Sequence, residues 1–176
     1  KQQFEQLEKQ VLLSKNLKQF WYKFIYFYSQ VLSMPFTFLE DIAIADVAFE
    51  ATGKTLEELL ESAALAVTNT MVKSLDSVKH RVEKKFAVEG DSSEKLLFNF
   101  LQELIFLKDV ELLLFSKFEL DVMPKKDKLQ LMVKAYGEKL DMKKHELLVD
   151  VKAVSMHNFK VEETKDGWIA SVILDV

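Results

Sequence analysis

The sequence predicts an α+β fold in which two helices pack on a largely antiparallel β-sheet. Two stretches carry apolar residues at helical spacing, and each begins with residues that can cap a helix. Other stretches alternate apolar and polar residues, as half-buried strands do. After the second predicted helix only strands follow, which favours an α+β fold over the regular alternation of an α/β fold. The 176 residues are 49% hydrophobic and 30% charged, an ordinary balance for one globular domain.

The first elements are predicted in the first half of the chain. Apolar residues at every second position in residues 36–38 and 47–51 indicate strands. Thr55 and Glu58 have the spacing of a capping box, in which the hydroxyl and the carboxylate accept hydrogen bonds from exposed backbone amides. A helix is therefore predicted over residues 55–73.

The later elements are one helix and a series of strands. A strand is predicted over residues 80–88, and Asp91 or Ser92 can cap the second helix, which is expected to end near Lys108. Further strands are predicted over residues 113–122, 129–136, 149–161 and 168–175. The last two should pair as an antiparallel hairpin, because the turn between them contains Gly167, and glycine tolerates a positive φ angle.

Residues 1–33 differ in amino-acid composition from the rest of the chain. They contain neither glycine nor proline, and Phe4, Leu7 and Val11 recur at helical spacing. We interpret them as an appended helical segment; an amphipathic helix resting on a membrane or a partner is the alternative. The chain begins with Lys1, and Met34 has the position of a second start. Residues 34–176 are therefore expected to fold as one domain.

The composition excludes several classes of function. A net charge of −4 and a pI of about 5.5 disfavour direct, tight RNA binding, because such binding requires a basic surface. The absence of cysteine removes disulfides and thiolate metal sites, which fits a reducing compartment. No apolar run approaches the roughly 20 residues of a membrane-spanning helix, so the main domain is expected to have no membrane contact.

Common enzymatic motifs are also absent from the sequence. The four glycines do not cluster, which excludes the phosphate-binding loops of P-loop and Rossmann proteins. Neither a His-x-x-x-His pair nor a Gly-x-Ser-x-Gly motif occurs. We expect His80 to be solvated and His157 to be structural rather than catalytic.

The acidic residues are the more informative candidates for a site. Asp41 and Asp46 lie in a largely apolar segment, and Asp175 closes an apolar strand just before Val176. Such oxygen atoms suit a hard cation such as Ca²⁺ or Mg²⁺. From spacing alone the signal is weak, and the favoured interpretation is that Asp41 caps a turn and that Asp175 only ends a strand.

Several segments, in the order in which they occur, are similar to sequence blocks of the archease family. These segments are residues 38–40, 45–51, 53–59, 96–104, 151–155, 166–168 and 173–176. The resemblance runs from about Phe36 to the end, and ordered agreement over that length is more specific than any short motif. Residues 1–33 lie outside it.

This resemblance implies a function and a site. Archeases are accessory factors of the RtcB-type RNA ligase of tRNA splicing; they promote guanylylation of the ligase and are not enzymes. The expected partner is therefore that ligase, with only indirect contact to tRNA, in the cytoplasm. The family is associated with a divalent cation held by the aspartate of an early Ala-Asp pair and by its last two residues. Carried over, these ligands are Asp46, Asp175 and Val176, with Ca²⁺ as the expected cation and Mg²⁺ or Mn²⁺ as alternatives.

The chain departs from the family pattern near the first of these ligands. Many members have His-Thr-Ala-Asp after a Leu-Glu pair, whereas residues 41–46 are longer and lack the histidine. Asp46 is still aligned by the alanine before it, and Asp41 could supply a compensating oxygen. His145 matches a histidine that precedes a later block of the family, and we expect it near the same surface.

Two other functions are compatible with these residues. One is a metal-dependent hydrolase or phosphotransferase that uses Asp46 and Asp175 with His145 as a base. The other is a chaperone-like binding module whose N-terminal helix contacts clients.

Overall fold

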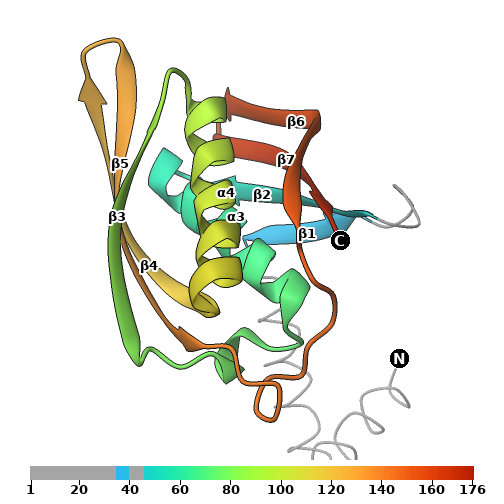
Figure 1. The fold of residues 1–176 in the computed structure, drawn as a ribbon. Coiled ribbons are helices and arrows are strands. Elements are labelled where there is room, and N and C mark those ends of the chain that lie inside the picture. The colour runs from blue at the N-terminus through green and yellow to red at the C-terminus, as the bar shows by residue number, and fades with distance from the viewer. Residues whose placement is uncertain (1–34, 40–45) are drawn as a thin grey trace, which may run out of the picture. The chain divides into compact units, whose positions relative to one another are not determined.

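A computed structural model describes residues 35–39 and 46–176, and within it Pro35–Val176 form one compact unit. Figure 1 shows the arrangement of its strands and helices. In chain order the elements are β1 (Phe36–Leu39), β2 (Asp46–Gly53), α3 (Leu56–Met71), the 3₁₀ helix η1 (Leu75–Ser77), β3 (Val82–Gly90), α4 (Ser93–Glu111), β4 (Leu113–Lys125), β5 (Lys128–Lys139), β6 (Ala153–Thr164) and β7 (Gly167–Asp175).

The strands form two antiparallel sheets. The first has the order β1-β2-β7-β6, so the last strand of the chain pairs with the second and lies inside the sheet. The second sheet has the order β3-β5-β4. Figure 1 shows the three-stranded sheet on one side of α4 and the four-stranded sheet on its other side.

Both helices begin at a hydroxyl cap. The Thr55 side chain accepts a hydrogen bond from the Glu58 amide at 3.2 Å, and the Glu58 carboxylate accepts one from the Lys54 amide at 2.7 Å. The Ser92 side chain accepts a hydrogen bond from the Lys95 amide at 3.1 Å. These bonds satisfy amides that have no partner inside the helix, so the first turn of each helix is fixed by its own sequence.

The helices fill the space between the sheets and contact both of them. On α4, Phe98 lies edge-on to Phe159 of β6 at 5.6 Å between ring centroids, and Phe100 lies edge-on to Phe118 of β4 at 5.9 Å. On α3, the Thr68 hydroxyl donates to the Phe115 carbonyl of β4 at 2.7 Å. The helices therefore connect the two sheets in one hydrophobic core. Phe100 is completely buried, and removal of its ring from water contributes about 2 kcal/mol to the stability of the fold.

The predicted α+β class is confirmed, with two helices and antiparallel strands. Both helices occur where they were predicted, although α4 continues three residues past Lys108 to Glu111. The predicted hairpin of the last two strands is present, with Thr164 opposite Gly167. The predicted single sheet is in fact two sheets. The expectations for residues 1–33 and for Asp41 fall outside the described residues.

No helix in the described part of the chain is long and apolar enough to cross a membrane.

Candidate cation site at the end of the four-stranded sheet

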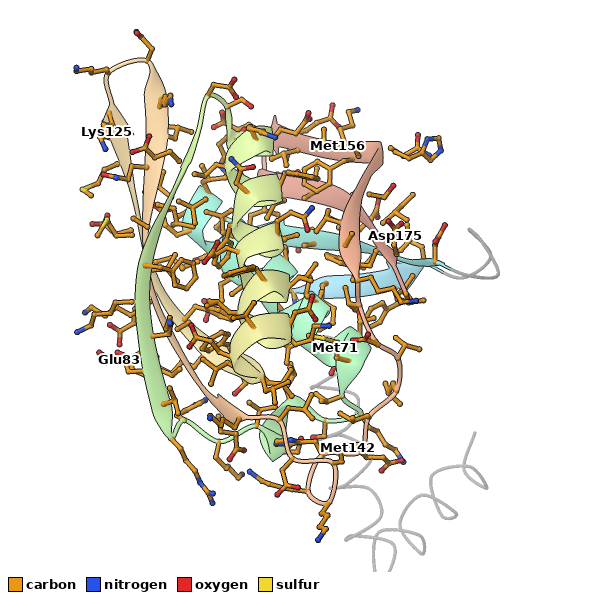
Figure 2. All side chains as sticks on the ribbon, viewed as in Figure 1. Met71, Glu83, Lys125, Met142, Met156 and Asp175 are labelled. Atoms are coloured by element: carbon orange, nitrogen blue, oxygen red, sulfur yellow. The ribbon has the colours of Figure 1, made fainter. Side chains whose placement is uncertain are left out.

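Asp46 and Asp175 are direct neighbours across two strands. Asp46 is the first residue of β2 and Asp175 the last residue of β7, and the antiparallel register places them opposite each other. Side chains that are directly opposite lie on the same face, with their Cβ atoms about 5 Å apart. Two aspartates 129 positions apart in the sequence (175 − 46) therefore meet at one end of the sheet. Figure 2 shows Asp175 at that end.

The face that carries these two carboxylates is the face turned away from the helices. Leu174, next to Asp175, is fully buried in the core, and alternation along β7 turns Asp175 to the opposite side. On this face the small Ala153 of β6 lies opposite Asp175, which leaves space beside the carboxylate. The next pair on the face is Ala48 and Ile173, both buried, so apolar groups border the site on that side.

The negative charges of the two aspartates are not compensated by a basic side chain among the described residues. Among the described residues neither takes part in an ion pair, and like charges directly opposite each other destabilise a sheet. Asp175 is exposed and Asp46 is half-buried, so a cation can reach both. The Lys152 amide donates to the Asp175 carbonyl at 2.8 Å, which fixes the backbone of the last β7 residue.

This arrangement offers only part of a complete metal coordination shell. Within residues 35–39 and 46–176 no third aspartate, glutamate, histidine or cysteine joins the pair. Val176 follows Asp175 directly, is half-buried, and adds main-chain oxygen. Oxygen donors without nitrogen or sulfur fit a hard cation, and such a cation would remove the repulsion between Asp46 and Asp175.

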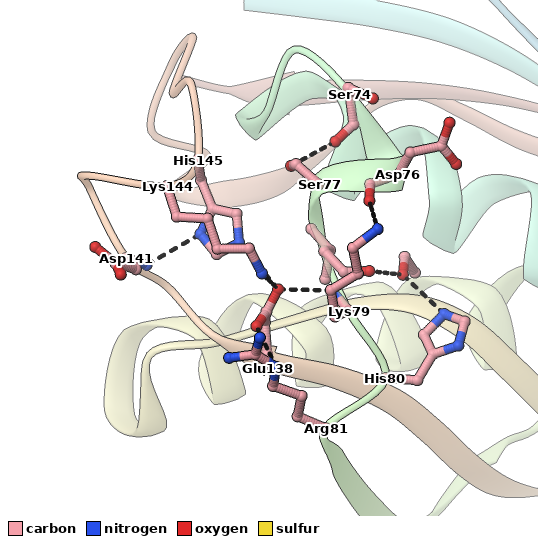
Figure 3. A network of polar contacts seen from close by, with 12 residues as sticks. Ser74, Asp76, Ser77, Lys79, His80, Arg81, Glu138, Asp141, Lys144 and His145 are labelled. Carbon is pink, nitrogen blue, oxygen red and sulfur yellow. Dashed lines mark hydrogen bonds and ion pairs between the residues drawn. The ribbon is translucent and has the colours of Figure 1, made fainter.

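His145 belongs to a different cluster, shown in Figure 3. Its side chain is 2% exposed; Nδ1 accepts a hydrogen bond from the Asp141 amide at 3.0 Å, and Nε2 lies 3.3 Å from Glu138 Oε1. Because Nδ1 accepts, Nε2 carries the proton and donates to Glu138. Both ring nitrogens are therefore occupied, so the ring is not free to act as a base. The expectation that His145 lies near the metal ligands is wrong: its partners are Glu138 and Asp141.

Glu138 is the centre of that cluster. Its carboxylate is 5% exposed and accepts hydrogen bonds from the Lys79 amide at 2.6 Å, from the Lys144 ammonium and from His145, while Arg81 Nε lies at 3.6 Å. Burial acts to raise the pKa of this carboxyl, but the bonds from Lys144, Lys79 and His145 outweigh it and lower the pKa to about 2. The cluster holds the segment before β3 against the loop after β5.

Of the other two histidines, His80 is solvated as predicted. His80 is exposed, and its Nε2 lies 3.1 Å from the Ser116 hydroxyl. His157 is exposed in an irregular part of β6. Glu138 was not identified from the sequence, because an isolated glutamate at the end of a strand gives no pattern that distinguishes a buried hub from a solvated charge.

Comparisons with known proteins agree with this fold. The family model of the Archease protein family (MTH1598/TM1083) matches residues 36–176. The curated protein archease of Pyrococcus furiosus is 41% identical over 133 residues, which are 75% of this chain and 93% of that protein. The protein archease of Pyrococcus abyssi is 38% identical with the same coverage.

A solved structure adds the comparison in three dimensions. The solution structure of a protein from Methanobacterium thermoautotrophicum is 36% identical and has a TM-score of 0.72. The match covers 81% of this chain and 99% of that chain. With a family model that spans most of the sequence and relatives above 30% identity along nearly their whole length, the chain belongs to the archease family.

Proposed function

We propose that this protein activates an RtcB-type RNA ligase of tRNA splicing, and that it does so without being an enzyme. It would act in the cytoplasm, binding the ligase and promoting attachment of GMP to it. A divalent cation held by Asp46, Asp175 and Val176 would form part of the contact. Membership of the archease family supports the activator role, and the opposed aspartates support the cation.

The observation that carries the proposal is the register of β2 against β7. It places Asp46 and Asp175 side by side at an exposed end of a sheet, where their charges repel and no described lysine or arginine compensates them. Calcium is the expected cation, because calcium accepts carboxylate and main-chain oxygens in flexible geometry, whereas Mg²⁺ requires a nearly ideal octahedron. When bound, the cation would supply a concentrated positive charge toward a negatively charged group of the partner.

The rest of the domain supports positioning rather than catalysis by this chain. The buried His145, the histidine suggested as a base, has both ring nitrogens occupied by Asp141 and Glu138. The acidic net charge disfavours direct binding of RNA backbone, so contact with tRNA would pass through the ligase.

The test measures GMP attachment to the purified ligase from GTP, with and without this protein, in calcium and in chelator. The parent protein is expected to speed attachment, and Asp46→Ala is expected to abolish the effect. Asp121→Ala, which removes an exposed carboxylate from β4 in the other sheet, is the matched control and should activate as the parent does.

Two results would separate the parts of the proposal. An Asp46→Ala protein that activates as well as the parent would show that the cation site is wrong while leaving the activator role intact. A parent protein that leaves the rate of GMP attachment unchanged would show that the ligase is not its partner.

A further inference from the structure

A second site lies at the opposite end of β2 and β7 from the aspartate pair. There a cleft of about 710 Å³ opens between the start of α3 and the β6–β7 hairpin. The lining residues that bear on its chemistry are Lys54, Glu58, Glu61, Ser62, Asp166 and Trp168. The end of the four-stranded sheet forms the floor of the cleft, and the first half of α3 forms one wall.

The walls of this cleft are fixed by backbone packing. A Cβ atom at Gly53 would lie 2.2 Å from the Leu59 amide nitrogen, and one at Gly167 would lie 2.4 Å from the Gly53 carbonyl oxygen. Gly167 also has a φ angle of +134°, which side chains rarely adopt. The hairpin, the end of β2 and α3 therefore touch main chain to main chain, and the cleft is a preformed part of the fold.

Trp168 forms an aromatic wall of the cleft. Its partner across β2 is Gly53, against which the α3 backbone packs, so the indole lies beside the start of α3 and lines the cleft. The ring is only half-buried. Among the described residues no second aromatic ring and no basic side chain stacks on it, although Lys95 and Lys117 stack on other rings.

Glu61 supplies a half-buried carboxylate to the same cleft. It takes part in no ion pair of the described residues. Burial raises the pKa of Glu61, a backbone hydrogen bond from Phe118 lowers it, the nearby Glu58 raises it, and Lys117 lowers it by a smaller amount; the net direction is upward. A partly desolvated acid beside another acid is stabilised by an incoming positive charge.

The remaining polar groups of the cleft disfavour an anion. Two amides at the start of α3, those of Lys54 and Glu58, are occupied by the capping bonds, which leaves fewer donors for a phosphate. The Ser62 hydroxyl donates to the Thr52 carbonyl at 2.8 Å. Glu58, Glu61 and Asp166 set three negative charges against the one positive charge of Lys54.

We propose that this cleft binds an arginine side chain of a protein partner, with the guanidinium stacked on Trp168 and paired with Glu61. A guanidinium is preferred to an ammonium because it is planar, stacks on aromatic faces and pairs with a carboxylate through two parallel bonds. Free arginine carries its own carboxylate, which Glu58 and Asp166 would repel, whereas an arginine inside a polypeptide does not. The site is separate from the aspartate pair and does not depend on the proposed function.

The test uses the full chain and the capped peptide acetyl-Gly-Arg-Gly-amide. The readout is the indole N–H resonance of Trp168, which is distinguished from that of the other tryptophan with a Trp21→Phe protein. The arginine peptide is expected to shift this resonance to saturation. The same peptide with citrulline, a neutral analogue of similar shape, is expected to leave it in place.

Two variants then test whether Glu61 is the carboxylate that pairs with the guanidinium. Glu61→Gln should weaken binding of the arginine peptide roughly fivefold, as expected for loss of one partly exposed charge pair. Glu94→Gln, which removes a half-buried acid from the first turn of α4, should bind as the parent does.

Three outcomes would show that the cleft does not bind an arginine side chain. They are a shift that does not saturate, an equal response to the citrulline peptide, and a Glu61→Gln protein that binds as tightly as the parent. Free L-arginine binding more tightly than the capped peptide would show that the ligand is a small molecule rather than a partner protein. The peptide comparison needs no substitution in the cleft, so it stands even where a cleft variant fails to fold.

Discussion

At the scale of single residues, two carboxylate arrangements with opposite electrostatics stand out. Asp46 and Asp175 face each other without a described basic partner, whereas Glu138 is surrounded by donors. The first pair costs stability until a cation arrives. The second arrangement stabilises the fold and depends on Glu138 keeping its charge.

The first prediction concerns Asp175→Asn. In chelator the variant should be at least as stable as the parent, with a gain of about 0.5 kcal/mol, because one of two repelling charges is gone. In calcium at a hundred times its dissociation constant the parent should gain about 2.7 kcal/mol and the variant much less. Thermal unfolding of both proteins in the two buffers measures this, with Asp121→Asn as the control. Equal stabilisation of both proteins by calcium would contradict the assignment of Asp175.

The second prediction concerns Glu138→Gln and pH. The pKa of Glu138 is lowered from 4.5 to about 2 in the folded protein, so its contribution to stability is complete above pH 4.5 and is lost as the pH falls toward 2. The variant should be less stable than the parent by about 2 kcal/mol at pH 7, because charge-assisted hydrogen bonds are lost. The difference should shrink between pH 4.5 and 2.

Denaturant unfolding at several pH values between 7 and 2 measures this difference. Glu146→Gln is the matched control: Glu146 lies in the loop after β5, next to His145 of the cluster, but its ion pair with Lys73 is exposed, so its removal should cost little. A difference between parent and Glu138→Gln that is constant over the whole pH range would contradict the linkage.

At the scale of elements, a β-bulge in β4 determines how the three-stranded sheet contacts the segment before β3. The register against β5 shifts between Phe115 and Lys117, which leaves Ser116 as an extra residue. The Ser116 hydroxyl donates to the Val78 carbonyl at 2.8 Å. Opposite this bulge lies Gly137, where the two backbones approach too closely for any side chain.

The third prediction is that Gly137→Ala destabilises the domain by about 3 kcal/mol, near the upper end for single substitutions. The added Cβ would lie 1.8 Å from the Leu114 carbonyl oxygen, so the strands must separate. Thermal unfolding of the variant measures the loss. Ala87→Gly, at an exposed position of β3, is the control and should cost only about 0.5–1 kcal/mol. Similar losses in the two variants would show that the bulge can relax.

Gly137 also illustrates which boundaries of helices and strands could be predicted from the sequence and which could not. The caps at Thr55 and Ser92 and the turn at Gly167 depend on neighbours in the chain, and these features were predictable. The strand predicted to end at Tyr136 continues through Gly137 to Lys139, because glycine marks a close backbone approach here rather than an end. The division into two sheets depends on long-range pairing, which local alternation does not encode.

For the candidate site the sequence supplied residues but not geometry. Asp46 and Asp175 could be named from the resemblance to the archease family, yet nothing local predicts that they are direct cross-strand partners. The buried cluster around Glu138 was missed, and His145 was expected near the wrong residues, because both depend on a loop that folds back on β5.

At the scale of the whole molecule, Pro35–Val176 contain both sheets, both helices and the core between them. The fourth prediction is that a protein shortened to begin at Met34 still folds. Its thermal unfolding should remain a single cooperative transition, because the caps, bulge and core described above all lie within the retained residues. Calorimetry of the shortened and full chains measures this. A broad transition without a peak in the shortened protein would show that residues 1–33 belong to the core.

Strand β7 places constraints on insertions and deletions during evolution. Trp168 faces the helices and Asp175, seven positions later, faces away from them. Because successive side chains of a strand alternate between faces, removing one residue between them would turn one of the two to the other face. Removing two residues would keep both orientations and only bring the two ends of the strand closer together. Among homologous sequences, length changes within this strand should therefore occur in pairs.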